Sequence, residues 1–298
     1  MGTVKNIKKE LFGFGLKEYK SENNGNFTAN DISVNITGNP VPANDITHYR
    51  CNMSESLLEL SLPKLGRFTV ESGKRITVIH NSDTEPEETI PFVYGSCMGA
   101  LLYQRGIIPL HGSAVLTEKG AAVFLGVSGA GKSTTAAGLA ERGYPIICDD
   151  ISAVKMQGRK AVLIPSNADI KLWKKSLDML EKSSDSLVPI RNKIEKYYLP
   201  LDSGSLKSDY PVNKIYVLHS HNEDIVKISD PLKGRAKFNS AEHHAYRRKF
   251  IKGLNRRKEF FSIMMNLLSN AEVKKVTRPK AGYFKELIDR IEQDINNG

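Results

Sequence analysis

The stretch Gly126-Val127-Ser128-Gly129-Ala130-Gly131-Lys132-Ser133 decides how the rest of this sequence is interpreted. It fits the pattern GxxxxGK[ST], in which a glycine-rich loop joins a β-strand to an α-helix. Residues 121–125 (AAVFL) are apolar, residues 132–143 have good helix propensity and end at a glycine, and residues 144–148 (YPIIC) form a second apolar run. The order strand, loop, helix, strand predicts an α/β fold that contains a P-loop.

Such a loop binds phosphate because its backbone N–H groups converge and the positive end of the next helix points the same way. We expect Lys132 to reach the β- and γ-phosphates and Ser133 to offer its hydroxyl to Mg²⁺. The alternative, a chance match, is disfavoured by the flanking strand and helix. The sequence therefore predicts that a nucleoside triphosphate, ATP or GTP, binds with Mg²⁺, with the nucleotide contacts at Gly126, Ser128, Gly129, Ala130, Gly131, Lys132, Ser133 and Thr134.

Polar side chains lie on either side of the P-loop in the sequence. Asp149 and Asp150 end the strand that follows the P-loop helix, so we expect both at the sheet edge beside the loop. One carboxylate there can hold Mg²⁺, and a second can accept a proton from an attacking hydroxyl. His111 precedes the hairpin that leads into the loop, where it either approaches the γ-phosphate, steadies an aspartate or has only a structural role.

The remaining pattern predicts a β-rich N-terminal region, residues 1–94, and a second domain, residues 95–298. Short alternating stretches separated by Gly, Pro, Asn and Asp predict strands between residues 20 and 94. In the second domain we expect hairpins over 108–126 and 151–165, a strand over 212–220, and helices over 91–106, 168–180, 240–254, 258–271 and 282–295. The last helix has a core-facing apolar stripe, formed by Phe284, Leu287, Ile288, Ile291 and Ile295.

Composition limits the class of protein. The net charge of +10 would suit a polyanionic ligand, but a lysine-rich solvated surface explains it equally. The basic clusters at 247–249 and 256–258 lack interleaved aromatic residues and a DNA-binding motif, so we expect no nucleic-acid partner. Three separated cysteines, no apolar core in MGTVKNIKKE and no membrane-length apolar stretch predict a cytoplasmic protein without a membrane partner.

Three elements taken together resemble a known family. PLHGSAV (109–115), GVSGAGKS (126–133) and ERGYPIICDD (141–150) are similar, in this order, to the catalytic domain of bacterial HPr serine kinase/phosphorylases. The similarity is tight over residues 105–155. It implies a P-loop fold related to phosphoenolpyruvate carboxykinase, with a mixed sheet, the β-rich region before it and helices at the C-terminal end.

The resemblance also implies roles for the polar residues. Lys132 and Ser133 would hold phosphates and Mg²⁺, and His111, Asp149 and Asp150 would form a cluster in which one aspartate is the base toward an acceptor serine. It does not say which one. We predict Asp149, Asp150, His111 and Lys132 as the catalytic residues, with Asp149 as the base, and Ser133 and Asp150 as metal ligands.

The sequence departs from that family in two places. The N-terminal region does not resemble the family's separate N-terminal domain, and no PGRN segment follows the two aspartates. The nearest stretch is LKGRAKFN around Arg235. These departures put specificity for HPr in doubt.

A shorter subgroup is similar over more of the chain. YQRGIIPLHGSAV, IKLWKKSLDML, KYYLPL and VNKIYVL resemble the HPr-kinase-like proteins of lasso peptide pathways. This implies an ATP-dependent kinase for the C-terminal serine of a precursor peptide. Arg235, Arg247 and Arg248 are then candidates for binding its carboxylate, or are ordinary surface charges. The alternatives are a kinase/phosphorylase of HPr or another regulatory protein, a small-molecule kinase, and a nucleotide-dependent binding module. The sequence is compatible with a monomer or a homo-oligomer.

Overall fold

Alternation of apolar and polar residues builds the N-terminal strands. In β6 (Gly66–Glu71) and β7 (Arg75–Asn81), Phe68, Val70 and Ile76 are fully buried while their sequence neighbours are more exposed. This is the period of a strand with one covered face. The computed structural model describes residues 10–12, 14–18, 31–41, 48–166, 169–189, 195–199, 206, 208–222, 224–280 and 282–297. In that part of the chain the β-rich prediction is confirmed.

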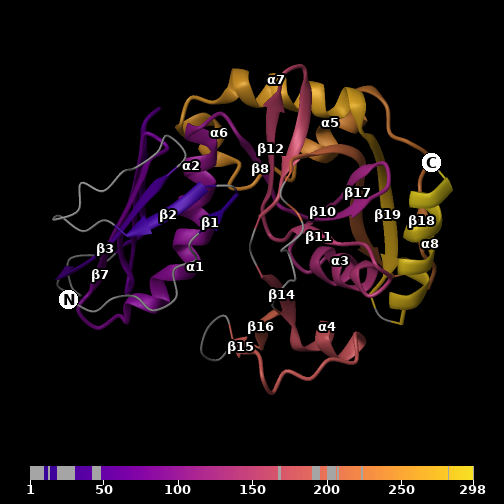
Figure 1. Ribbon diagram of the computed structural model, residues 1–298, viewed down its shortest axis with the longest axis horizontal. Coiled ribbons are helices and arrows are strands. Elements are labelled where there is room, and N and C mark those ends of the chain that lie inside the picture. The colour runs from indigo at the N-terminus through magenta and orange to yellow at the C-terminus, as the bar shows by residue number, and fades with distance from the viewer. Residues whose placement is uncertain are drawn as a thin grey trace. The chain divides into compact units, whose positions relative to one another are not determined.

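The chain divides into two units, residues 1–108 with 247–260, and residues 109–246 with 261–298 (Figure 1). The described strands of the first unit form one sheet in the order β1-β2-β3-β7-β6-β5-β4. The helical segment over residues 91–106 belongs to this first unit, whereas the sequence had placed it in the second domain. The other elements of this unit are β1 (Glu10–Leu11), β2 (Phe14–Glu18), β3 (Ile32–Val41), β4 (Arg50–Met53), β5 (Leu57–Leu62), a 3₁₀ turn (Pro86–Thr89), α1 (Ile90–Phe92), a π-helical turn (Val93–Cys97), α2 (Met98–Gln104) and α6 (Lys249–Gly253).

The second unit contains the P-loop and a mixed sheet whose described strands run in the order β11-β9-β10-β17-β13-β12-β8, with β19 beside β17 and β18 beside β19. At its centre β10, β17 and β19 are parallel. The α/β class with a mixed sheet and C-terminal helices is confirmed. Its strands are β8 (Ile108–Leu110), β9 (Gly112–Thr117), β10 (Gly120–Gly126), β11 (Ile146–Cys148), β12 (Ser152–Gln157), β13 (Lys160–Ile164), β17 (Tyr210–His221), β18 (Lys227–Ile228) and β19 (Glu272–Pro279).

Helices cover this sheet, and three further strands form a second, smaller sheet. The helices are α3 (Lys132–Ala140), α4 (Lys174–Met179), α5 (Gly234–Glu242), α7 (Arg257–Asn270), which belongs to this unit from residue 261, and α8 (Phe284–Asn297). The small sheet has the order β14-β16-β15, with β14 (Ile170–Trp173), β15 (Val188–Pro189) and β16 (Lys196–Leu199). No helix in the described residues has both the length and the apolar character needed to cross a bilayer.

Two of the expected helices were wrong, and several strands of the second unit were missed. The helix expected over 168–180 is strand β14 followed by the shorter helix α4, because Ile170 and Leu172 are buried in alternation with more exposed neighbours. The helix expected over 240–254 breaks into α5 and α6, with Arg247 between them at φ +48°. Strands β15, β16, β18 and β19 were not anticipated.

Helix α8 packs on the P-loop helix. Its predicted apolar stripe, from Leu287 to Ile295, is buried. Gly138 of α3 allows close approach, since a Cβ there would lie 2.7 Å from the Phe284 ring and 2.9 Å from Ile288. A larger residue would force α3 and α8 apart.

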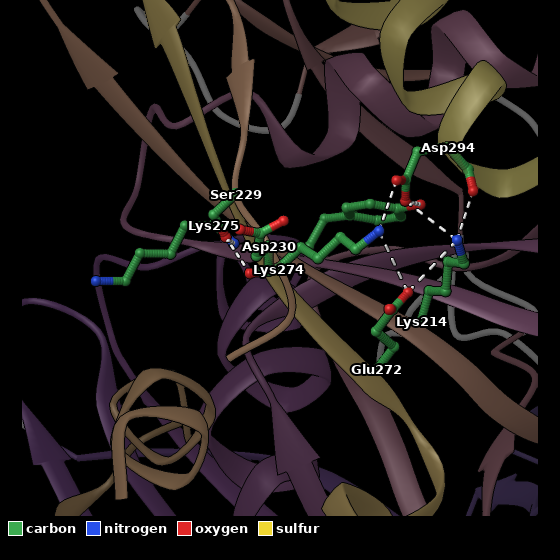
Figure 2. Close-up of polar contacts among 8 residues, drawn as sticks. Lys214, Ser229, Asp230, Glu272, Lys274, Lys275 and Asp294 are labelled. Carbon is green, nitrogen blue, oxygen red and sulfur yellow. Dashed lines mark hydrogen bonds and ion pairs between the residues drawn. The ribbon is translucent and has the colours of Figure 1, made fainter. Parts of the chain in front are cut away.

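The other end of α8 is fastened by a cluster of charges (Figure 2). The carboxylate of Asp294 accepts hydrogen bonds from Lys274 Nζ at 2.7 Å, Lys214 Nζ at 3.1 Å and the Tyr216 hydroxyl at 2.7 Å. Glu272 lies 3.5 Å from Lys214 Nζ and 3.4 Å from Lys274 Nζ. Tyr216 also stacks on Phe124 of the strand that leads into the P-loop. The cluster, here called the Asp294 cluster, ties α8 to the sheet.

Candidate active site

The P-loop joins a buried strand to a helix, as the sequence predicted. Gly129 and Gly131 have φ of +81° and +102°, which residues with a Cβ rarely adopt. Helix α3 begins at Lys132, so the N–H groups of its first turn have no carbonyl of a preceding turn to bind. These N–H groups and the positive helix end form a site suited to phosphate oxygens.

Lys132 lies across the loop. Its ammonium is buried and donates to the carbonyls of Gly126 at 3.0 Å and Val127 at 3.1 Å. Burial lowers the pKa of Lys132, and the nearby carboxylates of Asp149 and Asp150 oppose that change. Among the described residues the hydrogen-bond acceptors of Lys132 are two neutral carbonyls, so its positive charge can pair with an incoming phosphate.

Asp149 is buried at the end of β11. One carboxylate oxygen accepts a hydrogen bond from the Ser113 hydroxyl at 2.5 Å, and the other accepts one from the Lys171 backbone N–H at 2.9 Å. Asp149 therefore links β9 to β14, and both of its oxygens already have protein donors.

Asp150 occupies a strained turn. Its φ is +67°, and the N–H of Ile151 donates to the Asp149 carbonyl at 2.8 Å, which closes a three-residue turn around Asp150. The carboxylate accepts from Lys171 Nζ at 2.8 Å. Burial alone would raise the pKa of Asp150, but the Lys171 ammonium outweighs it and holds the pKa at about 2. Asp150 is therefore ionised at neutral pH.

His111 lies against the same turn. Its Nδ1 is 3.1 Å from the Asp150 carbonyl oxygen and 3.4 Å from a carboxylate oxygen of Asp150. Burial, and then the charge of Lys132, lower the pKa of His111, so the ring is neutral near pH 7. Because a carbonyl can only accept, we assign the proton to Nδ1, which leaves Nε2 as an acceptor atom.

Arg278 is a site residue that the sequence analysis missed. From the end of β19, its buried guanidinium donates to the carbonyls of Ala130 at 2.8 Å, Gly129 at 3.0 Å and Pro279 at 2.8 Å. It lies over the Tyr283 ring, 4.2 Å from the centroid. Because the C=O and N–H of a trans peptide point in opposite directions, holding the Ala130 carbonyl turns the Gly131 N–H away from Arg278. Arg278 therefore fixes the orientation of P-loop peptides.

A cavity of about 710 Å³ brings most of the predicted residues together. Its lining includes Ser128, Gly129, Gly131, Lys132, Ser133 and Thr134 of the P-loop, together with His111, Asp149, Asp150, Lys171, Arg278 and Tyr283. Among the described lining residues, Gly126, Ala130 and Arg235 do not occur; Arg235 is exposed on α5. Arg247 and Arg248 belong to the other unit.

Ser133 and Asp150 carry oxygen atoms of the kind that Mg²⁺ takes as ligands. Both line the cavity, and the carboxylate is ionised. Mg²⁺ prefers oxygen ligands and usually takes only one or two carboxylates beside phosphates and water. In the described residues no group of three or more His, Cys, Asp or Glu side chains could hold a metal ion.

Comparison with known proteins adds little to this geometry. No protein-family model matches the sequence, and no curated protein matches it. Among solved structures, the chain is similar to the HPr(Ser) kinase/phosphatase from Coxiella burnetii, with 13% identity over 64% of this chain and 99% of that one. The TM-score is 0.31. A structural overlap this loose supports no conclusion about this chain.

Proposed function

We propose that this protein is an ATP- and Mg²⁺-dependent kinase that transfers the γ-phosphoryl group to a serine hydroxyl. The observation that carries the proposal is the cavity in which the P-loop helix end, Lys132 and the polar cluster of His111, Asp149 and Asp150 meet. A binding module needs the first two, whereas a kinase also needs an acid-base group beside them.

The proposed chemistry is mostly positioning. Mg²⁺ would be held by Ser133 and Asp150 and would neutralise phosphate charge. The P-loop N–H groups and Lys132 orient the γ-phosphate and stabilise charge on its oxygens, since phosphoryl transfer passes through a loose transition state. Arg278 keeps the loop in the shape that presents those N–H groups.

Two candidates can receive the proton of the acceptor hydroxyl. Asp149 is the base that the sequence predicts, but both of its oxygens accept hydrogen bonds from Ser113 and Lys171. The Nε2 atom of His111, whose ring is held by Asp150, is the alternative base on the same cavity wall. Asp149→Asn and His111→Gln separate them: the true base shows the larger loss of kcat.

For the acceptor, we propose the C-terminal serine of a ribosomally made precursor peptide, as the resemblance to lasso-pathway kinases suggests. The alternative is HPr or another regulatory protein. The test incubates the protein with MgATP and either a serine-terminated peptide or purified HPr, and counts added phosphates by mass spectrometry.

We expect transfer to the peptide, and a loss of about 10³-fold in kcat for Lys132→Ala, since a charge-stabilising group is removed. Melting in the presence of MgATP supplies the control. If nucleotide raises the melting temperature but neither acceptor gains phosphate, the protein is a binding module rather than a kinase. Wild-type transfer by Lys132→Ala would exclude this site as the place of reaction.

A further inference from the structure

We infer that the acceptor carries an anionic group beside its hydroxyl and that β14, β16 and the start of α4 form the subsite for it. The anion that fits best is the carboxylate of a C-terminal serine. This inference rests on the proposed kinase function and extends it to the class of substrate.

The wall of the subsite is set by strand pairing. Trp173 at the end of β14 is paired directly with Lys196 of β16, and the Lys196 ammonium lies 5.5 Å from the centre of the indole ring. Lys174 and Lys175 follow Trp173 at the start of α4. All four side chains line the cavity that contains the P-loop. The wall is thus an aromatic face with three lysines around it, and one acidic residue, Glu195, lines the cavity beside them.

Lys196 lines the same cavity as Lys132 and Asp150. Burial lowers the pKa of Lys132 most, and the charge of Lys196 lowers it further. The same charge helps to keep Asp150 ionised, after the larger effect of Lys171. Lys196 therefore lies within electrostatic reach of both the phosphate-binding lysine and the aspartate turn.

The charge of the cavity exceeds what the nucleotide needs. Seven lining residues are Lys or Arg and three are Asp or Glu, which leaves four positive charges. ATP with one Mg²⁺ brings a charge of about −2. About two positive charges remain, and a concave site of one sign favours a ligand of the opposite sign.

The lysines that carry the excess belong to β16 and the start of α4. Lys171 of β14 is neutralised by Asp150 at 2.8 Å. Lys174, Lys175 and Lys196 form no ion pair with any other described residue. In a C-terminal serine the carboxylate is only two carbon atoms from the side-chain oxygen. One cavity can therefore place the hydroxyl at the phosphate and the carboxylate at the lysines, where charge-assisted hydrogen bonds form.

The experiment uses Trp173, which is the single tryptophan of the chain and lies in this wall. Its fluorescence is followed in the full-length protein, with Mg²⁺ and a non-hydrolysable ATP analogue, during titration with two synthetic peptides. Both end in serine and differ only in a free carboxylate or an amide at the C-terminus. We expect the carboxylate peptide to bind about tenfold tighter, as one charge-assisted contact allows.

Three variants locate the effect. Lys196→Gln, and Lys174→Gln with Lys175→Gln, should remove the preference for the carboxylate peptide. Lys280→Gln is the matched control, because Lys280 lines the same cavity but follows Arg278 on the P-loop side; it should keep the preference.

Equal binding of the two peptides, or no fluorescence change with either, would overturn the inference. So would a Lys196→Gln variant that loses nucleotide affinity but keeps the preference, since Lys196 would then serve the γ-phosphate. The proposed kinase is judged separately with hydrolysable ATP. A preference for the carboxylate peptide without phosphoryl transfer would support the subsite and reject the kinase function. Transfer to both peptides with equal KM would support the kinase function and reject the subsite.

Discussion

Two groups of positively charged side chains lie on or beside β19, and they have different partners. In the Asp294 cluster, Lys214 and Lys274 meet the carboxylates of Asp294 and Glu272 (Figure 2). Near the end of β19, Arg278 meets only carbonyl groups and an aromatic face among the described residues. A paired cluster fixes the fold. An unpaired guanidinium under the P-loop leaves positive potential where phosphates are proposed to bind.

The largest effect is expected in the paired cluster. Asp294→Ala leaves the buried Lys214 and the half-buried Lys274 with Glu272 as their remaining carboxylate, and it removes the acceptor of the Tyr216 hydroxyl, which together should cost about 3 kcal/mol of unfolding free energy. Urea unfolding measures it. The matched control is Asp289→Ala on the same helix, whose pair with Arg142 is exposed and should be worth less than about 1 kcal/mol. If the folded Asp294→Ala protein lost kcat instead of stability, the cluster would belong to the site.

Arg278→Met should show the opposite pattern. Without the two P-loop carbonyl contacts, we expect kcat/KM for MgATP to fall about 100-fold, or about 2.7 kcal/mol. The unfolding free energy should change less than in Asp294→Ala, because an apolar side chain replaces a buried charge. Arg278→Lys should fall between, since an ammonium lacks the planar fork. A loss of stability with unchanged kinetics would reduce Arg278 to a structural residue.

Acid titration tests the second paired site, Asp150 with Lys171. The folded-state pKa of Asp150 is about 2 against an ordinary value of 3.8. A carboxyl with a depressed pKa stabilises the fold above its unfolded-state pKa, so about 2 kcal/mol is present above pH 4 and is lost as the pH falls through 2. In Lys171→Met this loss between pH 4 and 2 should become smaller, as urea unfolding at several pH values would show. An unchanged pH dependence would contradict the pairing.

The smallest effect is expected at the ring beside Arg278. Tyr283→Leu removes a cation–π contact worth about 1 kcal/mol. KM for MgATP should therefore rise less than tenfold, with kcat nearly unchanged, in steady-state kinetics. A change as large as that of Arg278→Met would mean that Tyr283 itself contacts the nucleotide.

Features that depend on residues close together in the sequence could be predicted from it. The P-loop follows from spacing within eight residues, and the apolar stripe of α8 follows from helical period. Asp149 and Asp150 were placed beside the loop because a short strand can only end at the sheet edge. These features needed no knowledge of distant segments.

What was missed depends on contacts far apart in the sequence. β19 was overlooked because Lys274 and Lys275 interrupt its apolar residues, and only the structure pairs Lys274 with Asp294 of the later helix. Arg278 meets carbonyls about 148 residues earlier in the chain. In β14 a period of two competes with a helical composition, and pairing with β16 decides it. Each of these features depends on contacts between segments that are far apart in the sequence.

Isothermal titration calorimetry with Mg²⁺ and a non-hydrolysable ATP analogue tests the central claim most directly. We predict that wild-type protein and Asp294→Ala bind the analogue with the same Kd under conditions where both are folded, and that Arg278→Met binds at least about tenfold more weakly. Absence of binding to the wild-type protein, or equal weakening in both variants, would contradict the account.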